Sequence, residues 1–245
     1  MWIYKSWKFS EMKPIDFFPK FNTLDAYSIK VDFHLHSTWT DGKNSVAEII
    51  QSAKKHDLHS IAITDHIRSS STYFDDYKKE IDFLNAEQEL NIYSGFEAKV
   101  ADFSGNIDVQ KEVAKAADIA IVSVHRFPFG RKLYNASEFK RSIAQEMELE
   151  LNLAALNRGG FNVLGHPGGM SLSFFEEFPT HFYEEIILGC VKNEIAFDLN
   201  GRYHNNQIAL LYPLLKKHNP FISIGTDSHS TDTMGMWNKA LEETI

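Results

Sequence analysis

The sequence predicts an α/β protein, a single-domain distorted (β/α)7 barrel of the TIM type. Seven short segments rich in β-branched and apolar residues alternate with six amphipathic helical segments. That alternation is typical of a parallel sheet with right-handed crossovers. No glycine-rich phosphate loop follows the first strand segment, which disfavours an open nucleotide-binding sheet. The length of 245 residues suits a closed barrel, which we assign to residues 30–245 with an N-terminal extension at 1–29.

The strand segments are recognised by alternation and apolar density. They span residues 30–36, 59–64, 91–97, 119–125, 161–166, 195–200 and 221–226. The helical segments span residues 45–58, 76–90, 107–117, 138–160, 180–194 and 206–219. Ser45 and Glu48 have the spacing of a capping box at the start of the first helix. Pro213 lies inside the last helical segment, where we expect it to kink or split the helix.

Composition and charge exclude several classes of protein. The net charge of −8, without blocks of Lys or Arg, disfavours binding to duplex nucleic acid. No window approaches the eighteen consecutive apolar residues of a membrane span, and charged residues interrupt the aromatic N-terminus where a signal peptide would be apolar. The single cysteine, Cys190, excludes an internal disulfide framework and lies in an apolar segment typical of a buried thiol. We therefore expect a cytoplasmic protein.

Imidazoles and carboxylates fall at the C-terminal ends of six of the seven strand segments. In "VDFHLH", His34 and His36 are two residues apart and so share one face of a strand. The strand ends of a parallel barrel converge at one mouth, so we expect the whole set to meet there. The set comprises His34, His36, Asp41, His66, Glu97, His125, His166, Asp227 and His229.

Nine such side chains exceed the four to six ligands of one ion and suit two or three divalent ions of Zn, Mn or Fe. A lone histidine is more often structural or solvated. His56, His59, His181 and His218 keep that interpretation, because they lie on or beside helical segments.

The segments "DFHLHS", "TDH", "GFE", "SVH", "GHP" and "GTDSH", in this order and at these intervals, resemble the polymerase-and-histidinol-phosphatase (PHP) family of metal-dependent phosphoesterases. The resemblance covers about residues 30–232. It implies a distorted seven-stranded barrel with a trinuclear metal site at its C-terminal mouth. It further implies that a more buried pair of ions is held by His34, His36, Glu97, His125 and Asp227. Asp41, His66, His166 and His229 would complete that pair or hold the third ion.

The function that this site predicts is metal-dependent hydrolysis of a small phosphomonoester, with histidinol phosphate as the nearest family example. Two ions would share and deprotonate a water, and the hydroxide would attack phosphorus in line. We expect His34, His36 and Asp227 to be central to this chemistry, with the third ion and cationic side chains holding the phosphate oxygens. The expected partner is a small phosphorylated metabolite. The aromatic N-terminal segment either packs on the barrel or mediates a homodimer, and the sequence leaves both alternatives open.

Several further residues follow strand ends. Arg202 follows the one strand segment without a predicted metal ligand and is the first candidate for a phosphate clamp. Arg126 and Arg131 are the next candidates, followed by Arg68 and Lys99. Asp65 either orients the ring of His66 or serves as a turn residue. We expect His204 to lie on the surface.

Three alternative functions stay open. The first is phosphodiester cleavage of nucleotides or short oligonucleotides, in which Trp39, Tyr73 and Phe74 could stack a base. The second is a C–N hydrolase of the amidohydrolase type, which also begins with HxH but places a lysine or carboxylate on the fourth strand, where this chain has His125. The third is a non-catalytic metal-binding module, because ligands alone do not establish turnover.

Overall fold

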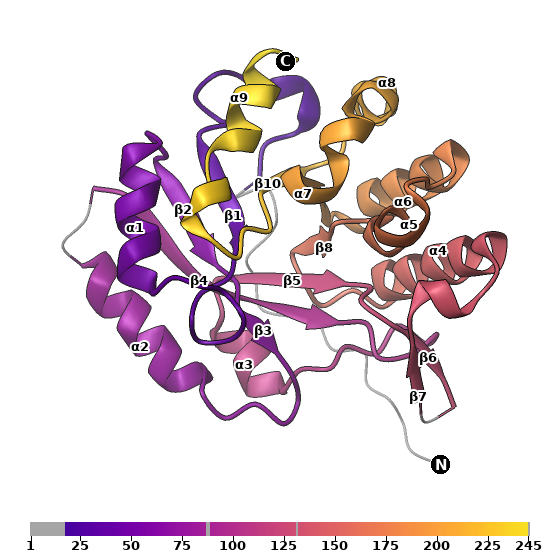
Figure 1. Ribbon diagram of the computed structural model, residues 1–245, viewed down its shortest axis with the longest axis horizontal. Coiled ribbons are helices and arrows are strands. Elements are labelled where there is room, and N and C mark those ends of the chain that lie inside the picture. The colour runs from indigo at the N-terminus through magenta and orange to yellow at the C-terminus, as the bar shows by residue number, and fades with distance from the viewer. Residues whose placement is uncertain (1–17, 87–88, 131, 245) are drawn as a thin grey trace.

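The computed structural model describes residues 18–86, 89–130 and 132–244. Seven parallel strands form a nearly closed barrel with helices arranged around it (Figure 1), as predicted. The order around the sheet is β1-β2-β4-β5-β8-β9-β10. The strands are β1 (Val31–Leu35), β2 (Ser60–Ile63), β4 (Asn91–Lys99), β5 (Ile119–Ser123), β8 (Val163–Gly165), β9 (Ala196–Asn200) and β10 (Ile222–Gly225).

The barrel closes between the last residue of β1 and the segment that follows β10. Leu35 and Ser228 form an isolated parallel bridge, and the His36 N–H donates to the Ser228 carbonyl at 3.0 Å. Every other neighbouring pair forms a parallel ladder, such as the five paired residues of β4 and β5. The seam therefore joins the first and last strands at the mouth of the barrel.

Three short strands that the sequence did not predict follow the ends of the barrel strands. β3 (His66–Ile67) adds two residues in parallel to β4, and β6 (Phe127–Phe129) pairs with β7 (Lys132–Tyr134) in an antiparallel hairpin. Segments of two or three residues are too short to show a hydrophobic period, so pattern alone does not reveal them.

All six predicted helices form. They are α1 (Val46–Lys55), α2 (Phe74–Asn85), α3 (Lys111–Ala116), α4 (Arg141–Arg158), α6 (Thr180–Asn193) and α8 (Ile208–His218). The described ranges also contain α5 (Gly169–Phe175), α7 (Gly201–His204), α9 (Met236–Glu242) and the 3-10 turns η2 (Phe21–Thr23), η3 (Ala136–Glu138), η4 (Asn205–Gln207) and η5 (Thr231–Thr233). Within the described residues, no helix is long and apolar enough to cross a membrane.

Two local predictions about helices have different outcomes. The capping box at α1 is present, with the Ser45 and Glu48 side chains each bonded to the other's backbone N–H. Pro213 does not split α8, because the helix runs unbroken through it, while the alternative expectation of a kink stays a prediction. The N–H that proline lacks would have bonded to the carbonyl of Ala209, an exposed residue, so water can replace that bond.

The barrel strands are buried on both faces, since helices cover the outside and side chains fill the inside. β1, β5 and β9 are buried along their whole length. The described part of the N-terminal extension packs beside β10. Phe18 is buried there, and the Ile222 N–H donates to the Pro19 carbonyl at 2.9 Å. Residues 1–17 lie outside the described residues, so both alternatives for the aromatic segment, packing on the barrel and dimerisation, stay open.

Candidate metal centre

The structure brings all nine predicted residues together at the mouth of the barrel. Each lies at the C-terminal end of a strand or in the loop that follows it, except His66, which begins the short β3. Their side-chain atoms form one continuous network of close contacts, with Glu97 near the middle. We call the set the metal-centre residues: His34, His36, Asp41, His66, Glu97, His125, His166, Asp227 and His229.

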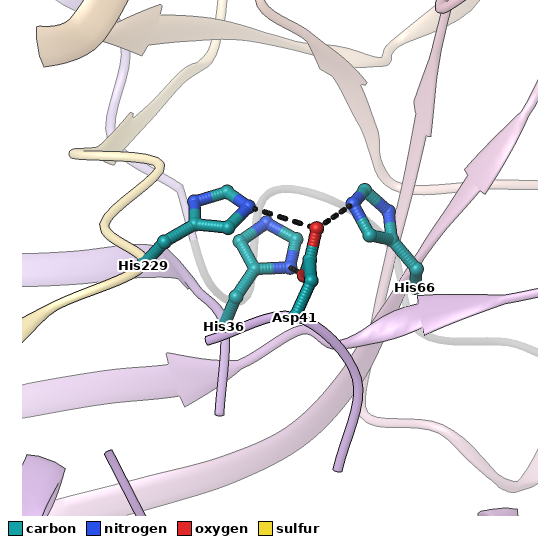
Figure 2. Close-up of side chains that lie close together, drawn as sticks. All are labelled: His36, Asp41, His66 and His229. Carbon is teal, nitrogen blue, oxygen red and sulfur yellow. Dashed lines mark ion pairs between the residues drawn. The ribbon is translucent and has the colours of Figure 1, made fainter. Parts of the chain in front are cut away.

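The most open part of the cluster is a group of four residues. Figure 2 shows the Asp41 carboxylate between the rings of His66 and His229, with His36 beside it. Asp41 Oδ2 lies 3.4 Å from His66 Nε2 and 3.3 Å from His229 Nε2, and Asp41 Oδ1 lies 3.8 Å from His36 Nδ1. One oxygen or nitrogen of each residue falls within 4.8 Å of the others, a spacing that can hold a metal ion.

Two further groups of three share residues with the first. His34, His36 and Asp227 form a buried group, in which His36 Nε2 is 3.2 Å from Asp227 Oδ1. His66, Glu97 and His125 form the other, with Glu97 3.0 Å from His66 and 3.2 Å from His125.

The ninth residue, His166, joins through Glu97. Its Nε2 lies 2.9 Å from Glu97 Oε1. The three groups and His166 are thus bridged by His36, His66 and Glu97. Such sharing is what neighbouring ions with common ligands require.

Several ligand atoms in the cluster are buried without a hydrogen bond. Within the described residues they are His34 Nε2, both ring nitrogens of His36, and Glu97 Oε2. Buried polar side-chain atoms are normally paired, so a convergent set of unpaired lone pairs is typical of residues that bind a cation. Imidazole and carboxylate donors suit borderline divalent metals. The residues therefore fit metal ions.

Burial and mutual charge set the protonation of the cluster. Burial is the main cause that lowers the pKa of His36 to about 4, so its ring is neutral and free to act as a ligand. Burial alone would raise the pKa of Glu97, but the charges of His125 and His34 and hydrogen bonds from His125 and His166 hold it well below its usual range. Metal binding should therefore displace protons from the imidazoles that now balance Glu97.

Asp198 on β9 is a functional residue that the sequence analysis missed. Its carboxylate accepts hydrogen bonds from His34 Nδ1 at 3.0 Å, from the His166 backbone N–H at 3.1 Å and from the Asn200 amide at 2.9 Å. The bond to Nδ1 fixes the tautomer and turns Nε2 of His34 towards the cluster. The strand without a predicted metal ligand, β9, therefore carries the carboxylate that orients the ring of His34.

Two metal-centre residues adopt left-handed backbone conformations. Asp227 has φ 51° and His166 has φ 28°. Aspartate and histidine are both enriched in this region, but the φ of His166 falls below the usual range of about +50 to +70°, so its backbone is the more strained of the two. Strain of this kind persists where surrounding contacts fix the chain, often at functional sites. At His166 those contacts include Asp198 and the bond from the Gly169 N–H to the His166 carbonyl.

The predictions for the neighbouring residues Asp65 and His204 have different outcomes. Asp65 accepts from the Ser37 N–H at 3.0 Å, from its hydroxyl at 2.6 Å and from the Thr40 hydroxyl, so it holds the turn that leads to Asp41. This favours the turn interpretation of Asp65. The expectation for His204 was wrong: it is fully buried between Asn200 and Pro167, because α7 folds back over the end of β9.

The candidate phosphate-binding arginines lie in different surroundings. Arg202 Nη1 is 3.4 Å from both Asp227 Oδ2 and His229 Nδ1, and its side chain is half exposed at the mouth. Arg126 is exposed and donates to the Asn135 side chain, with no ion pair to the metal-centre residues in the described chain. Arg131 lies outside the described residues. Among the predicted arginines that the structure describes, Arg202 is the one that the geometry joins to the cluster.

A barrel whose strand ends converge on histidines and carboxylates belongs to the metal-centred (β/α) barrels. The family model of the PHP domain matches residues 32–211. The chain therefore belongs to the PHP family, as its motifs predicted.

Relatives of this chain include a protein that the match covers over most of its length and a much longer one. It is 25% identical over 218 residues to the "Probable phosphatase" of Caldicellulosiruptor bescii, covering 84% of this chain and 82% of that protein. It is 27% identical over 221 residues to the "DNA polymerase/3'-5' exonuclease PolX" of Bacillus subtilis. That match covers 86% of this chain but spans 36% of PolX.

A solved structure supports the fold. Histidinol phosphate phosphatase (HISK) from Lactococcus lactis, crystallised with Zn, L-histidinol and phosphate, superposes with a TM-score of 0.67 at 21% identity. The match covers 88% of this chain and 92% of that one. The predicted TIM-like barrel is thereby confirmed.

Proposed function

We propose that this protein is a metal-dependent phosphomonoesterase acting on a small phosphorylated metabolite. The observation that carries the proposal is the convergence of nine imidazoles and carboxylates with unpaired, buried ligand atoms. Relatives named as phosphatases and a structural neighbour crystallised with Zn and phosphate support the same class of reaction. Two or three ions of Zn, Mn or Fe would be held by the metal-centre residues.

The charge of the site explains why metal is needed. Asp41, Glu97 and Asp227 give the cluster three carboxylates, in a chain of net charge −8. Without metal, only protons on the neighbouring imidazoles offset these carboxylates, and no cation is present to polarise a phosphoryl group or activate a water. Bound divalent ions would reverse the field, polarise the phosphoryl group and activate a water. Turnover should therefore depend almost completely on metal.

The chain's own side chains supply binding and orientation. Arg202 stands beside Asp227 and His229, where its guanidinium can donate to non-bridging phosphate oxygens. Asp198 holds the His34 ring, and Asp65 holds the turn that leads to Asp41. These contacts keep the ligand geometry fixed before substrate arrives.

Phosphodiester cleavage is the second candidate, supported by the similarity to PolX. A free stacking platform for a base would favour it. Trp39 and Tyr73 do stack, with ring centroids 5.7 Å apart. However, Trp39 Nε1 donates to Glu80 Oε2 at 2.6 Å and the Tyr73 hydroxyl donates to the His66 carbonyl, so both rings support the site's own loops. This favours the monoester.

The test is phosphate release from a panel of phosphomonoesters, including histidinol phosphate, with a phosphodiester beside them. We expect release from a monoester by protein loaded with Mn²⁺, Zn²⁺ or Fe²⁺, and its loss with chelator. His181→Ala, at an exposed histidine outside the cluster, is the matched control for the ligand variants. Turnover of the diester alone would support the nuclease. Silence on every ester would favour the C–N hydrolase or a non-catalytic metal-binding module.

A further inference from the structure

A cavity of about 540 Å³ opens beside the metal centre, between the loop after β10, α7 and α9. Asp227 and His229 line both the cavity and the metal cluster, and Arg202 stands at the boundary, 3.4 Å from each. The volume falls in the range of roughly 300–1,000 Å³ typical of small-molecule sites. A phosphoryl group at the metal centre would therefore have this cavity next to it.

One wall of the cavity is apolar and rigid. Trp237 is 3% exposed and its indole N–H donates to the Leu199 carbonyl at 2.8 Å. Gly201 packs so closely on it that an added Cβ would lie 2.7 Å from Trp237 Cβ. Met236, 65% exposed, and Ala240 extend this wall. Trp237 is almost fully covered and fixes the floor of the cavity, so the surface offered to an apolar body comes from Met236 and Ala240.

The charged side chains that line the cavity are mainly cationic. Lys43 and Arg202 both line it, and Lys43 is exposed with no ion pair to any described residue. The one carboxylate in the lining is Asp227, which is 3.2 Å from His36 and belongs to the metal centre. With Arg202 beside the phosphoryl position, Lys43 is left to meet a second anionic group. The same charges disfavour an ammonium such as that of histidinol.

We propose that this cavity binds the leaving group of the substrate and selects one with an apolar body that ends in an anionic group, a carboxylate or a second phosphate. The inference rests on the proposed phosphomonoesterase function and specifies its substrate class. It assigns specificity to Lys43, Met236 and Ala240.

The test compares esters that all release a primary alcohol. Mn²⁺-loaded full-length protein is given 4-carboxybenzyl phosphate, 4-methylbenzyl phosphate, ethyl phosphate and histidinol phosphate, and kcat/KM is measured by phosphate release. We expect the carboxylate to be preferred over the methyl group by up to about fivefold, the size of an exposed ion pair. Both benzyl esters should exceed ethyl phosphate by about tenfold or more, because their rings are buried against Met236 and Ala240.

Variants test which residues cause the preference for a carboxylate and the preference for a benzyl group. Lys43→Met should abolish the preference for the carboxylate, and Ala240→Leu, which fills the cavity, should narrow the ratio of benzyl to ethyl ester. Lys239→Met removes a charge from the same helix α9 but outside the cavity lining, and should keep both ratios. Equal rates for the carboxy and methyl esters, a retained preference in Lys43→Met, or histidinol phosphate as the best substrate would each overturn the inference.

A binding measurement separates this inference from the proposed function. If no ester is hydrolysed, the phosphomonoesterase proposal fails, while calorimetry with the alcohol 4-(hydroxymethyl)benzoate still tests the cavity. We expect binding that is weaker for 4-methylbenzyl alcohol and weaker in Lys43→Met. Equal binding of the two alcohols, or no binding of either, would refute the cavity's selectivity even in an active phosphatase.

Discussion

His204 is held in the core as a neutral imidazole, and its replacement should change how stability depends on pH. Its Nδ1 accepts from the Asn200 N–H at 3.1 Å, so Nε2 carries the proton and donates to the Pro167 carbonyl at 2.9 Å. Burial is the main cause that lowers the pKa of His204 to about 4 from 6.5. A second proton would have to enter at Nδ1 and break the bond from Asn200.

The magnitude follows from this lowered pKa. Above pH 6.5 the ring is neutral in both folded and unfolded chains, and its contribution to stability is fully present. As the pH falls from 6.5 towards 4, the unfolded chain binds a proton that the folded chain refuses, so stability is lost. A difference of 2.5 pKa units corresponds to about 3 kcal/mol, of which about 2 kcal/mol is gone by pH 5.

His204→Phe fills the site but cannot bind that proton. At pH 8 we expect it to be less stable than the wild type, because the Asn200 N–H and the Pro167 carbonyl lose their partner, at about 1–3 kcal/mol each. At pH 5 the gap should be about 2 kcal/mol smaller. Urea unfolding of metal-free protein at pH 8, 6.5 and 5 measures it, with His181→Phe at an exposed position as control. A gap that stays constant with pH would refute the reasoning.

Three further predictions concern the metal centre and its surroundings. His34→Ala or Asp227→Ala should abolish phosphate release and lower the melting temperature of the metal-loaded protein, while the circular dichroism spectrum stays native. Wild-type rates in both variants would refute the assignment of the metal site. Arg202→Ala should raise KM for a phosphomonoester about tenfold, as expected for losing a charged hydrogen bond; an unchanged KM would remove its clamp role. Asp198→Asn should weaken Mn²⁺ binding about 10–100-fold in calorimetric titration, since the ring of His34 loses its anionic acceptor; native affinity would contradict that role.

The strand ends could be predicted from the sequence because their signals are local. An i, i+2 pair such as His34 and His36 fixes a shared face, and a parallel barrel then brings every strand end to the same mouth. Asp198 and Asn200 repeat that i, i+2 spacing on the predicted strand 195–200, but nothing local shows that Asp198 will bind the ring of His34, which lies 164 residues away in the sequence. His204 sits in the polar segment "GRYH", and nothing local shows that the ring will pack against Phe197 and Tyr183. Contacts of this kind are decided by tertiary packing alone.

The contacts that close the barrel also bring the metal-centre residues together. Asp227 and His229 flank Ser228, and Ser228 is the residue that pairs with Leu35 and accepts from the His36 N–H across the seam. The same backbone contacts that join β10 to β1 therefore bring the last two metal-centre residues to the first two. Because the seam rests on an isolated bridge rather than a full ladder, ions that His36 and Asp227 hold together would add bonds where the barrel has fewest. Metal binding should then stabilise the closed barrel most at this seam, by binding the folded state in preference to the unfolded one.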